Sequence, residues 1–247
     1  MKAAAPAQRR LLDLQAEDTA IAQLQHRRRS IPELAAIADA RAVRARLSES
    51  LIGVGTEVAD LQLEVDKAEA DLVPVRERRA RDEQRVGDGV LTDPKQLNAM
   101  LDEIQHLGGR ISDLEEIALD AMERLEAATN TQEQLTAERT DLEHSMRAMI
   151  ASRDEQAAML DAEIAVHQRT RDEIAADMPS DLLALYERIR DKSGGLGAAA
   201  LRGRRCSGCQ LEATPIALAG YAAADPDEVL RCEECERVLV RVPAGNH

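Results

Sequence analysis

Apolar residues between Leu47 and Val75 recur at alternating intervals of four and three residues without a break. This spacing is that of the a and d positions of a left-handed coiled coil, and it extends here over about four heptads. A helix with such a stripe is stable only when another helix covers the stripe. The chain therefore needs a second long helix. The positions of this first seam are Leu47, Leu51, Val54, Val58, Leu61, Val65, Ala68, Leu72 and Val75.

A second apolar seam begins after Pro94 and predicts the partner helix. Between the seams, Gly87 and Gly89 are typical of a helix end, and Thr92 or Asp93 before Pro94 is typical of a helix start. Because the two arms are nearly equal in length and the connector is short, the sequence predicts an antiparallel helical hairpin with its turn near residues 87–93. The second seam comprises Leu97, Leu101, Ile104, Ile111, Leu114, Ala118, Ala121, Leu125 and Ala128, and polar Gln132, Arg139 and Arg153 interrupt its continuation.

Composition agrees with long helices and argues against a large globular core. The chain of 247 residues has no Phe and no Trp, and it has only two Tyr, so the usual bulky core residues are missing. Charged residues make up 32% of the chain, which is typical of coiled coils. The formal net charge of -14 gives no overall attraction to nucleic acid or to an anionic membrane.

Two further breaks divide the chain. Ser30-Ile31-Pro32-Glu33 has the pattern of a helix-capping box, so we expect a break near residues 30–32. Met178-Pro179-Ser180 predicts another near residues 178–180, followed by a short amphipathic helix and by a strand with Val238, Val240 and Val242 at alternate positions. We therefore expect a mainly α fold: a coiled-coil hairpin over residues 1–178, and over residues 179–247 a short helix with a small β module.

The four cysteines form two Cys-x-x-Cys pairs, and both pairs lie in the small module. Each pair can grip a metal in a tight turn, and two pairs on one ion give tetrahedral sulfur coordination. Residues 196–247 are too few to fold on hydrophobic burial alone, so we expect one structural Zn²⁺ per chain. Iron in a rubredoxin-like site, a redox dithiol and reduced thiols without metal are the alternatives. The expected ligands are Cys206, Cys209, Cys232 and Cys235.

The motifs around these cysteines resemble a known family. The segments "YERIR", "GGLGAAALRGRRCSGC" and "VLRCEECERVLVR" are similar to bacterial C4-type zinc-ribbon proteins with an N-terminal coiled coil. The segments "LTDPKQLNAMLDEIQHL" and "DLEEIALDAMERLE" resemble the second hairpin arm of that family. The resemblance implies a long hairpin followed by a zinc ribbon with the same four cysteine ligands. One position departs from the family, which usually has Gly where this chain has Glu236, and a positive φ there would strain a glutamate.

Two functions fit this sequence. The first is a non-enzymatic zinc-binding coiled-coil adaptor that binds a protein partner through the hairpin, the ribbon or both. The alternative is a regulator that binds RNA or DNA through the ribbon, because Arg202, Arg204 and Arg205 beside the first cysteine pair could contact phosphates. Stacking aromatic residues are nearly absent from the ribbon, where Tyr221 stands alone, and this weakens the alternative.

Enzymatic activity and membrane association are not expected. The five histidines are scattered along the chain, and no nucleophile, base or phosphate loop accompanies them. The first residues lack the apolar core of a secretory signal, and no apolar run approaches the roughly 18 residues of a membrane span. We therefore expect a cytoplasmic protein without a small-molecule substrate. Homo-oligomerisation along exposed parts of the seams is left open.

Overall fold

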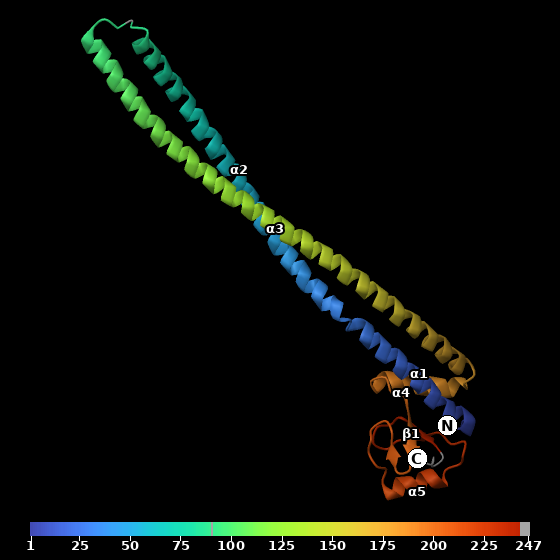
Figure 1. Cartoon of the computed structure of the whole chain (residues 1–247). Coiled ribbons are helices and arrows are strands. Elements are labelled where there is room, and N and C mark those ends of the chain that lie inside the picture. Colours follow the sequence, from blue (N-terminus) through green and yellow to red (C-terminus); the bar gives the residue numbers. More distant parts are fainter. Residues whose placement is uncertain (90, 243–247) are drawn as a thin grey trace. The chain divides into compact units, whose positions relative to one another are not determined.

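The computed structural model describes residues 1–89 and 91–242, and long helices dominate it (Figure 1). The prediction of a mainly α fold with a long helical hairpin and a small β part is confirmed. The elements are α1 (Ala5–Arg29), α2 (Pro32–Gly87), α3 (Pro94–Ala176), α4 (Ser180–Lys192), β1 (Ala198–Arg202), β2 (Arg205–Cys206), α5 (Pro215–Ala223), β3 (Leu230–Arg231) and β4 (Val238–Arg241).

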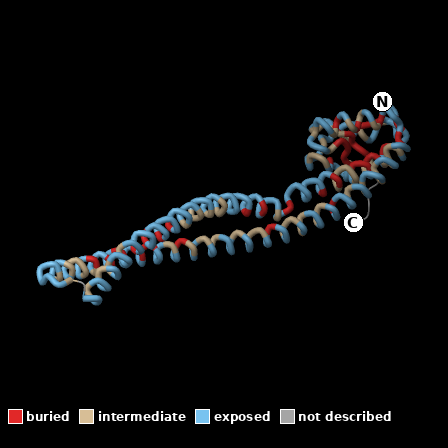
Figure 2. Tube along the Cα trace, turned by 90° about the horizontal axis from the view of Figure 1, so that it is seen from above, coloured by how far each residue is buried: buried red, intermediate tan, exposed pale blue. Residues whose placement is uncertain are grey.

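The chain divides into two compact units. Unit 1 combines Met1–Ala35 with Ile150–His247, and unit 2 is Ala36–Met149. The predicted boundary between residues 178 and 179 falls inside unit 1 and stays a prediction. Figure 2 shows buried residues gathered among the short elements of unit 1, whereas the paired helices carry them as a sparse stripe.

Unit 2 is an antiparallel pair formed by parts of α2 and α3. Its best-packed stretch is a small apolar core in which seam residues of the two helices meet. Ion pairs join the helices beside this core, at 2.9 Å between Arg124 and Glu64 and at 2.7 Å between Arg78 and Glu103. The predicted pairing of the two seams is thus observed. The core consists of Ala68, Leu72, Ile111, Leu114 and Ala118, with Val75 packed against it.

The ends of the two arms follow from local sequence. The α2 helix ends at Gly87, and Gly89 has a φ of 65°, which favours glycine. At the start of α3, the Asp93 carboxylate accepts a hydrogen bond of 3.0 Å from the backbone N–H of Lys95, so Asp93 is the capping residue. Residue 90, which belongs to the predicted turn, lies outside the described residues.

The seams are less uniform than their spacing predicts. Leu61, Val65, Ala68 and Leu72 are buried, but the positions from Leu47 to Val58 are only half-buried. A β-carbon at Gly55 would lie 3.4 Å from the Gln132 amide nitrogen, so polar Gln132 occupies the place of an apolar partner in this stretch. On α3, the predicted seam residue Leu101 is exposed, whereas Leu107, which the seam leaves out, is buried.

The break between α1 and α2 uses Ser30 differently from a capping box. The Ser30 hydroxyl donates to the carbonyl oxygens of His26 and Arg27, so it closes the end of α1 and does not cap α2. The Glu33 carboxylate instead accepts hydrogen bonds from the Ser152 hydroxyl and the Gln156 amide of α3. The capping-box interpretation is therefore wrong, because the side chains of α3 compete for the glutamate.

Unit 1 is built around a four-stranded sheet in the order β2-β1-β4-β3. The central strands β1 and β4 run parallel, with Ala199 opposite Leu239, and both outer pairs are antiparallel. Successive side chains alternate between the faces of the sheet. Ala198, Val238 and Val240 therefore join the core made by α1 and α4, whereas Ala199 and Leu239 face the cysteines.

On the side of the sheet that faces α1 and α4, Tyr186 packs closely against Gly197. A β-carbon at Gly197 would lie 2.6 Å from the Tyr186 carbonyl oxygen, so only glycine fits between α4 and β1. The side chains of Leu11, Leu14, Leu182 and Tyr186 are completely buried in this core. Within the described residues, none of the helices is both long and apolar enough to span a membrane.

Candidate metal centre

The four cysteines lie on two similar turns at the ends of short strands. Cys206 ends β2 and Cys209 follows it in a turn, while Cys232 directly follows β3 and Cys235 lies in the turn before β4. Each turn is closed by a backbone hydrogen bond of 2.9 Å, from Gln210 to Cys206 in the first and from Glu236 to Cys232 in the second. Both pairs therefore form knuckles, in which two thiols point to the same side.

The residue after the second cysteine is left-handed in both knuckles. Glu236 has a φ of 58°, as the departure from the family's usual glycine predicts, and Gln210 has a φ of 63° at the equivalent position. Local hydrogen bonds hold both residues: the Gln210 amide donates to the Ser207 carbonyl, and the Arg231 guanidinium donates to the Glu236 carbonyl. These contacts offset part of the steric cost of a side chain in this conformation.

The four sulfur atoms converge on one point. They all lie within 4.8 Å of one another, and the Sγ–Sγ distance is 3.9 Å both for Cys206 with Cys235 and for Cys209 with Cys232. Tetrahedral zinc–sulfur bonds of about 2.3 Å place neighbouring sulfurs about 3.8 Å apart. The donor set and its spacing therefore fit one tetrahedral ion, and the predicted four residues are those that the fold brings together.

Burial and hydrogen bonding shift the pKa values of the cysteine thiols in different directions. Burial raises the pKa of Cys206, and it raises the pKa of Cys232 to about 12. Burial acts in the same direction on Cys235, but hydrogen bonds from the backbone and side chain of Arg237 outweigh it and lower the pKa of Cys235 to about 7. Thiolates bind metals, so one thiolate is available near neutral pH and a bound cation would favour ionisation of the others.

The sheet and Tyr221 support the cysteines from behind. Ala199, Leu230 and Leu239 form a small apolar cluster with Cys206 and Cys232. The Tyr221 hydroxyl donates to the Arg231 carbonyl at 3.2 Å, and it accepts from the backbone N–H of Glu233 at 3.3 Å. A side chain of α5 thereby fixes the second knuckle.

Two supports of this module lie far from the cysteines in sequence, and sequence reasoning missed both. The first is the N-terminal segment: the backbone N–H of Ala3 donates to the Asp227 carbonyl at 2.7 Å, and Val229 donates to the Met1 carbonyl at 3.1 Å. The second is Arg241, whose guanidinium donates to carbonyl oxygens of the loop between the knuckles. The isolated arginine in "VLVRV" is the only sequence signal for the latter. The carbonyls belong to Tyr221, Ala224, Asp225, Pro226 and Glu228.

A buried polar network attaches α1 to the module. The Gln15 side chain accepts a hydrogen bond of 2.7 Å from the Gly197 backbone and donates to the Gly195 carbonyl at 3.0 Å. One turn later, the Asp18 carboxylate accepts hydrogen bonds from Arg171, Tyr186 and Arg190. The α1 helix, which the predicted domain division places in the hairpin over residues 1–178, is therefore part of the unit that contains the cysteines.

The arginines predicted to contact nucleic acid lie at the turn between β1 and β2. Arg202, Arg204 and Arg205 are all exposed, and Gly203 between them has a φ of 59°. Arg205 also approaches Glu212, with 3.6 Å between its guanidinium nitrogen and the carboxylate oxygen. The fold brings the three guanidinium groups to one hairpin turn, directly before Cys206.

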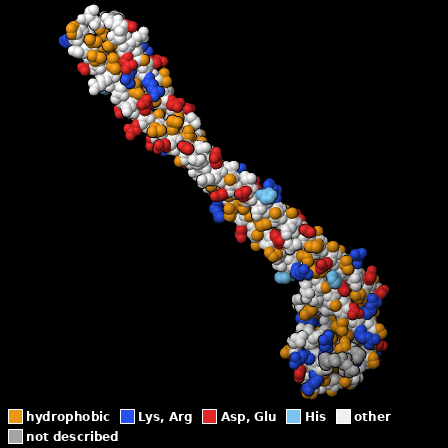
Figure 3. All heavy atoms as spheres, in the orientation of Figure 1, with side chains coloured by type: hydrophobic (Ala, Val, Ile, Leu, Met, Phe, Trp, Pro, Cys, Tyr) orange, Lys and Arg blue, Asp and Glu red, His pale blue; other side chains and the backbone are white. Residues whose placement is uncertain are grey.

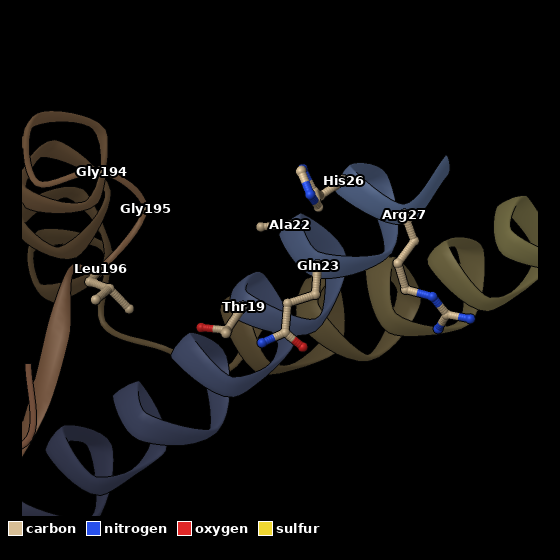
Figure 4. Close-up of a pocket in the computed structure, with 8 residues that line it drawn as sticks. All are labelled: Thr19, Ala22, Gln23, His26, Arg27, Gly194, Gly195 and Leu196. Atoms are coloured by element: carbon tan, nitrogen blue, oxygen red, sulfur yellow. The ribbon is translucent and has the colours of Figure 1, made fainter. Parts of the chain in front are cut away.

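A hollow of about 520 Å³ lies between α1 and the segment that follows α4. In Figure 4, Leu196 and Thr19 point toward one another across it, and Arg27 points away from Leu196. None of the described lining residues carries a carboxylate or a thiol. The lining residues are Thr19, Ala22, Gln23, His26, Arg27, Gly194, Gly195 and Leu196.

Comparison with known proteins identifies the family. Residues 14–194 match the family described as the CT398-like coiled coil hairpin domain. The chain belongs to this family. The matched residues cover most of both arms and the α4 helix but end before the first cysteine, so the hairpin part of the resemblance is confirmed and the zinc-ribbon part stays a prediction.

Relatives and solved structures agree with this assignment. Uncharacterized protein Rv2229c of Mycobacterium tuberculosis is 35% identical over 246 residues, which cover 98% of each chain. A solved structure from Mycobacterium smegmatis is 31% identical, covers 98% of this chain and all of its own, and has a TM-score of 0.83. CT398 from Chlamydia trachomatis is 18% identical, covers 96% of this chain and 98% of its own, and has a TM-score of 0.68, so it shows the same fold.

Proposed function

We propose that this protein is a non-enzymatic adaptor in which one structural Zn²⁺ stabilises the C-terminal module and the helical surfaces bind a protein partner. The observation that carries the metal part is the convergence of four cysteine sulfurs within 4.8 Å. Four thiolates fill a tetrahedral ion completely, so the ion would have no open position for water and would serve folding. Reduced thiols suit a reducing compartment, and the cytoplasm is therefore part of this proposal.

Metal analysis tests the zinc proposal. The purified protein should contain one zinc per chain and show none of the visible absorption that iron–thiolate sites give. Cys206→Ser and Cys232→Ser should lose the metal, whereas Cys209→His should retain it because zinc also accepts imidazole nitrogen. Far-ultraviolet circular dichroism should stay nearly unchanged in the serine variants, since no cysteine contributes to the seams of unit 2. Protein without zinc, or general loss of helix in these variants, would contradict the proposal.

Charge pairing on the hairpin supports a protein partner. The arginine-rich segment before the turn, residues 76–85, contains five arginines and three acidic residues, but the guanidinium groups of Arg76, Arg78, Arg79 and Arg81 pair with neighbouring acids. Arg76 contacts Glu115 at 2.5 Å, and Arg79 contacts Glu83 at 2.9 Å. Figure 3 shows acidic and basic side chains interspersed along the long helices. Such a mixed surface suits selective protein contacts more than phosphate binding.

Co-purification with and without nuclease tests the kind of partner. The tagged protein from native lysate should retain a defined protein partner after nuclease treatment. Complete loss of every bound component on nuclease treatment would instead favour nucleic acid as the ligand.

Nucleic-acid binding is the second candidate, and the exposure of three adjacent arginines favours it. If Arg202, Arg204 and Arg205 contact phosphates, the affinity should fall with salt with a log–log slope of about -0.7 to -0.9 per contact. Replacing all three with Ala should flatten the slope by roughly two to three units while zinc stays bound. An unchanged slope would place any binding elsewhere, and absence of binding at low salt would leave the adaptor as the function.

A further inference from the structure

The α5 helix is apolar on every side but buried on none. Its nine residues, PIALAGYAA, include no charged side chain, and no residue of the helix is buried. Helices that are apolar all around are ordinarily enclosed by other structure. In Figure 1, α5 is the orange-red helix beside the strands of unit 1.

The two faces of α5 have different environments. Ala217, Leu218 and Tyr221 are half-buried against the module, and Tyr221 contacts the cysteine cluster. The opposite face carries Ile216, whose exposed fraction of 86% is the highest among the large apolar residues of the described chain. A solvent-facing helical face ordinarily carries polar residues, and the outer face of α5 has none. The outer face consists of Ile216, Ala219, Gly220, Ala222 and Ala223, with exposed Leu211 just before the helix.

Both ends of α5 are fixed in place. At its start, the Thr214 hydroxyl accepts from the Ala217 backbone at 3.1 Å and donates to the Glu233 carboxylate at 2.9 Å. At its end, Arg241 donates to the Ala224 carbonyl at 3.0 Å. The outer face is therefore presented by a preformed helix, which lowers the entropic cost of binding.

Acidic side chains border the exposed face at both ends. Glu233 contacts Thr214 at the start of α5 and is followed in sequence by Glu234, and Asp227 and Glu228 follow the end of the helix; all four are exposed. Arg204 and Arg205 also lie beside residues 212–213 at the start, where Arg205 pairs with Glu212 at 3.6 Å. Within the described residues none of these four carboxylates forms an ion pair, whereas the neighbouring Asp225 is neutralised by Lys2 at 2.9 Å. A surface that pairs with this face therefore gains from apolar area at its centre and positive charge at its rim.

We propose that α5 is a docking helix that inserts its outer face into an apolar groove of a partner protein, with Lys and Arg side chains around that groove. This inference rests on the proposed adaptor function and adds the site and the chemistry of the partner. Recognition follows the helix-in-groove mode, in which a short row of apolar anchors supplies affinity and flanking charges supply orientation. Ile216 is the central anchor.

Two synthetic peptides provide defined probes. One is a 16-residue amphipathic helix of about equal numbers of Leu and Lys, and the other replaces every Lys with Glu. In fluorescence anisotropy at moderate salt, the wild-type protein should bind the Leu/Lys peptide more tightly than the Leu/Glu peptide. Ile216→Ser should weaken Leu/Lys binding roughly tenfold or more, which is about 1.4 kcal/mol, because the complex no longer buries the apolar surface of the isoleucine.

Matched variants distinguish the docking helix from general attraction to an acidic protein. Ile52→Ser removes an equally apolar side chain that is 73% exposed on α2, and it should not change Leu/Lys binding. Glu228→Gln with Glu234→Gln should weaken binding several-fold more than Glu57→Gln with Glu69→Gln on the hairpin. Equal effects of Ile216→Ser and Ile52→Ser, or preference for the Leu/Glu peptide, would overturn the proposal.

Other occupants of this face give different results. Ile216-dependent binding to zwitterionic lipid vesicles, or self-association in sedimentation that Ile216→Ser abolishes, would assign the face to a membrane or to a second copy and overturn the proposal. Once a nuclease-resistant protein partner is in hand, Ile216→Ser should lose it while zinc content stays at one per chain. If Ile216→Ser retains the partner in full, the docking-helix proposal is wrong, but the proposed adaptor function is not contradicted.

Discussion

At the scale of single residues, Asp18 is the most constrained charge of the described chain. Its carboxylate is only 11% exposed and accepts hydrogen bonds from Arg171 at 3.0 Å, Arg190 at 3.1 Å and the Tyr186 hydroxyl at 2.6 Å. Burial opposes ionisation of Asp18, but the hydrogen bonds from Tyr186, Arg171 and Arg190 outweigh it and lower its pKa. A single carboxylate thus joins three helices of unit 1.

We expect Asp18→Asn to destabilise unit 1 by roughly 2 to 4 kcal/mol, because two partly buried guanidinium groups lose their counter-charge. Urea unfolding followed by tyrosine fluorescence measures this, since Tyr186 lies in the affected core. Asp13→Asn, an exposed change on the same helix, should cost less than about 0.5 kcal/mol. Equal stability of the two variants would contradict the role given to Asp18.

The same network predicts an acid-sensitive contribution to stability. A carboxyl whose pKa is lowered on folding stabilises the native state above its unfolded pKa, and this contribution is lost as the pH falls through the native value. The stability of the wild type should therefore fall on acidification below about pH 4. The difference in the free energy of unfolding between the wild type and Asp18→Asn should become smaller over the same pH range. Urea unfolding at several pH values measures it. A constant difference would indicate that Asp18 does not titrate with folding.

At the scale of elements, the long helices of unit 2 are unevenly packed. Neither residues 41–60 of α2 nor residues 129–145 of α3 include a buried side chain, whereas the stretches that contain Leu72 and Leu114 do. The weakly packed stretch also contains Gly53 and Gly55, and Thr136 and Thr140 donate to carbonyls one turn before them. Glycine and such back-bonding both lower helix stability.

Hydrogen exchange should resolve this difference. Backbone amides in residues 47–58 and 129–142 should exchange faster than those in residues 61–72 and 107–121, because local opening exposes less apolar surface. A β-carbon at Gly53 would have no atom within 4 Å, so Gly53→Ala is sterically possible. Because alanine has a higher helix propensity than glycine, this change should slow hydrogen exchange in residues 47–58. Uniform protection along both helices would show that packing does not set local stability in this hairpin.

At the scale of the whole molecule, segments from distant parts of the sequence complete unit 1. The Met1–Ala3 segment pairs with residues 227–229, and α1 contributes Leu11 and Leu14 to the core that β1 and β4 share with α4. Arg241 holds the same loop by donating hydrogen bonds to its carbonyl oxygens. The loop between the two cysteine pairs is therefore fixed by contacts that include no cysteine.

Removal of residues 1–4 should consequently loosen the cysteine module without changing a ligand. We expect faster zinc transfer to a chromophoric chelator and faster hydrogen exchange in residues 221–229, since the backbone hydrogen bonds of Met1 and Ala3 are lost. Arg241→Lys should have a similar effect, because lysine cannot reproduce the planar fork of donors. Arg188→Lys on α4 is the control and should transfer zinc at the wild-type rate. If both test variants transfer zinc at the wild-type rate, the four cysteines alone would determine how long the protein retains zinc.

For the candidate site, the sequence by itself determined which four cysteines come together. Cysteine is rare in this chain, and the spacing of Cys206, Cys209, Cys232 and Cys235 is a local property that a knuckle turn requires, so the pattern could be recognised without a fold. The supports of the site could not be recognised in this way. The Gln15 and Arg241 side chains bind backbone carbonyls or N–H groups, which are identical at every residue and leave no sequence pattern. The α5 helix was missed as well, although Thr214-Pro215 is a helix-start signal.

For the fold, heptad spacing determined that two long helices pair, because a/d burial depends only on residues a few positions apart. Which positions of the seam are covered depends on the facing helix, so Leu101 is exposed and Leu47–Val58 are half-buried. Tertiary structure also decided that α1 joins the cysteine module. The reason is physical: Leu11, Leu14 and Asp18 gain stability from side chains more than 150 residues away in sequence, such as Tyr186, and no local pattern encodes such a contact.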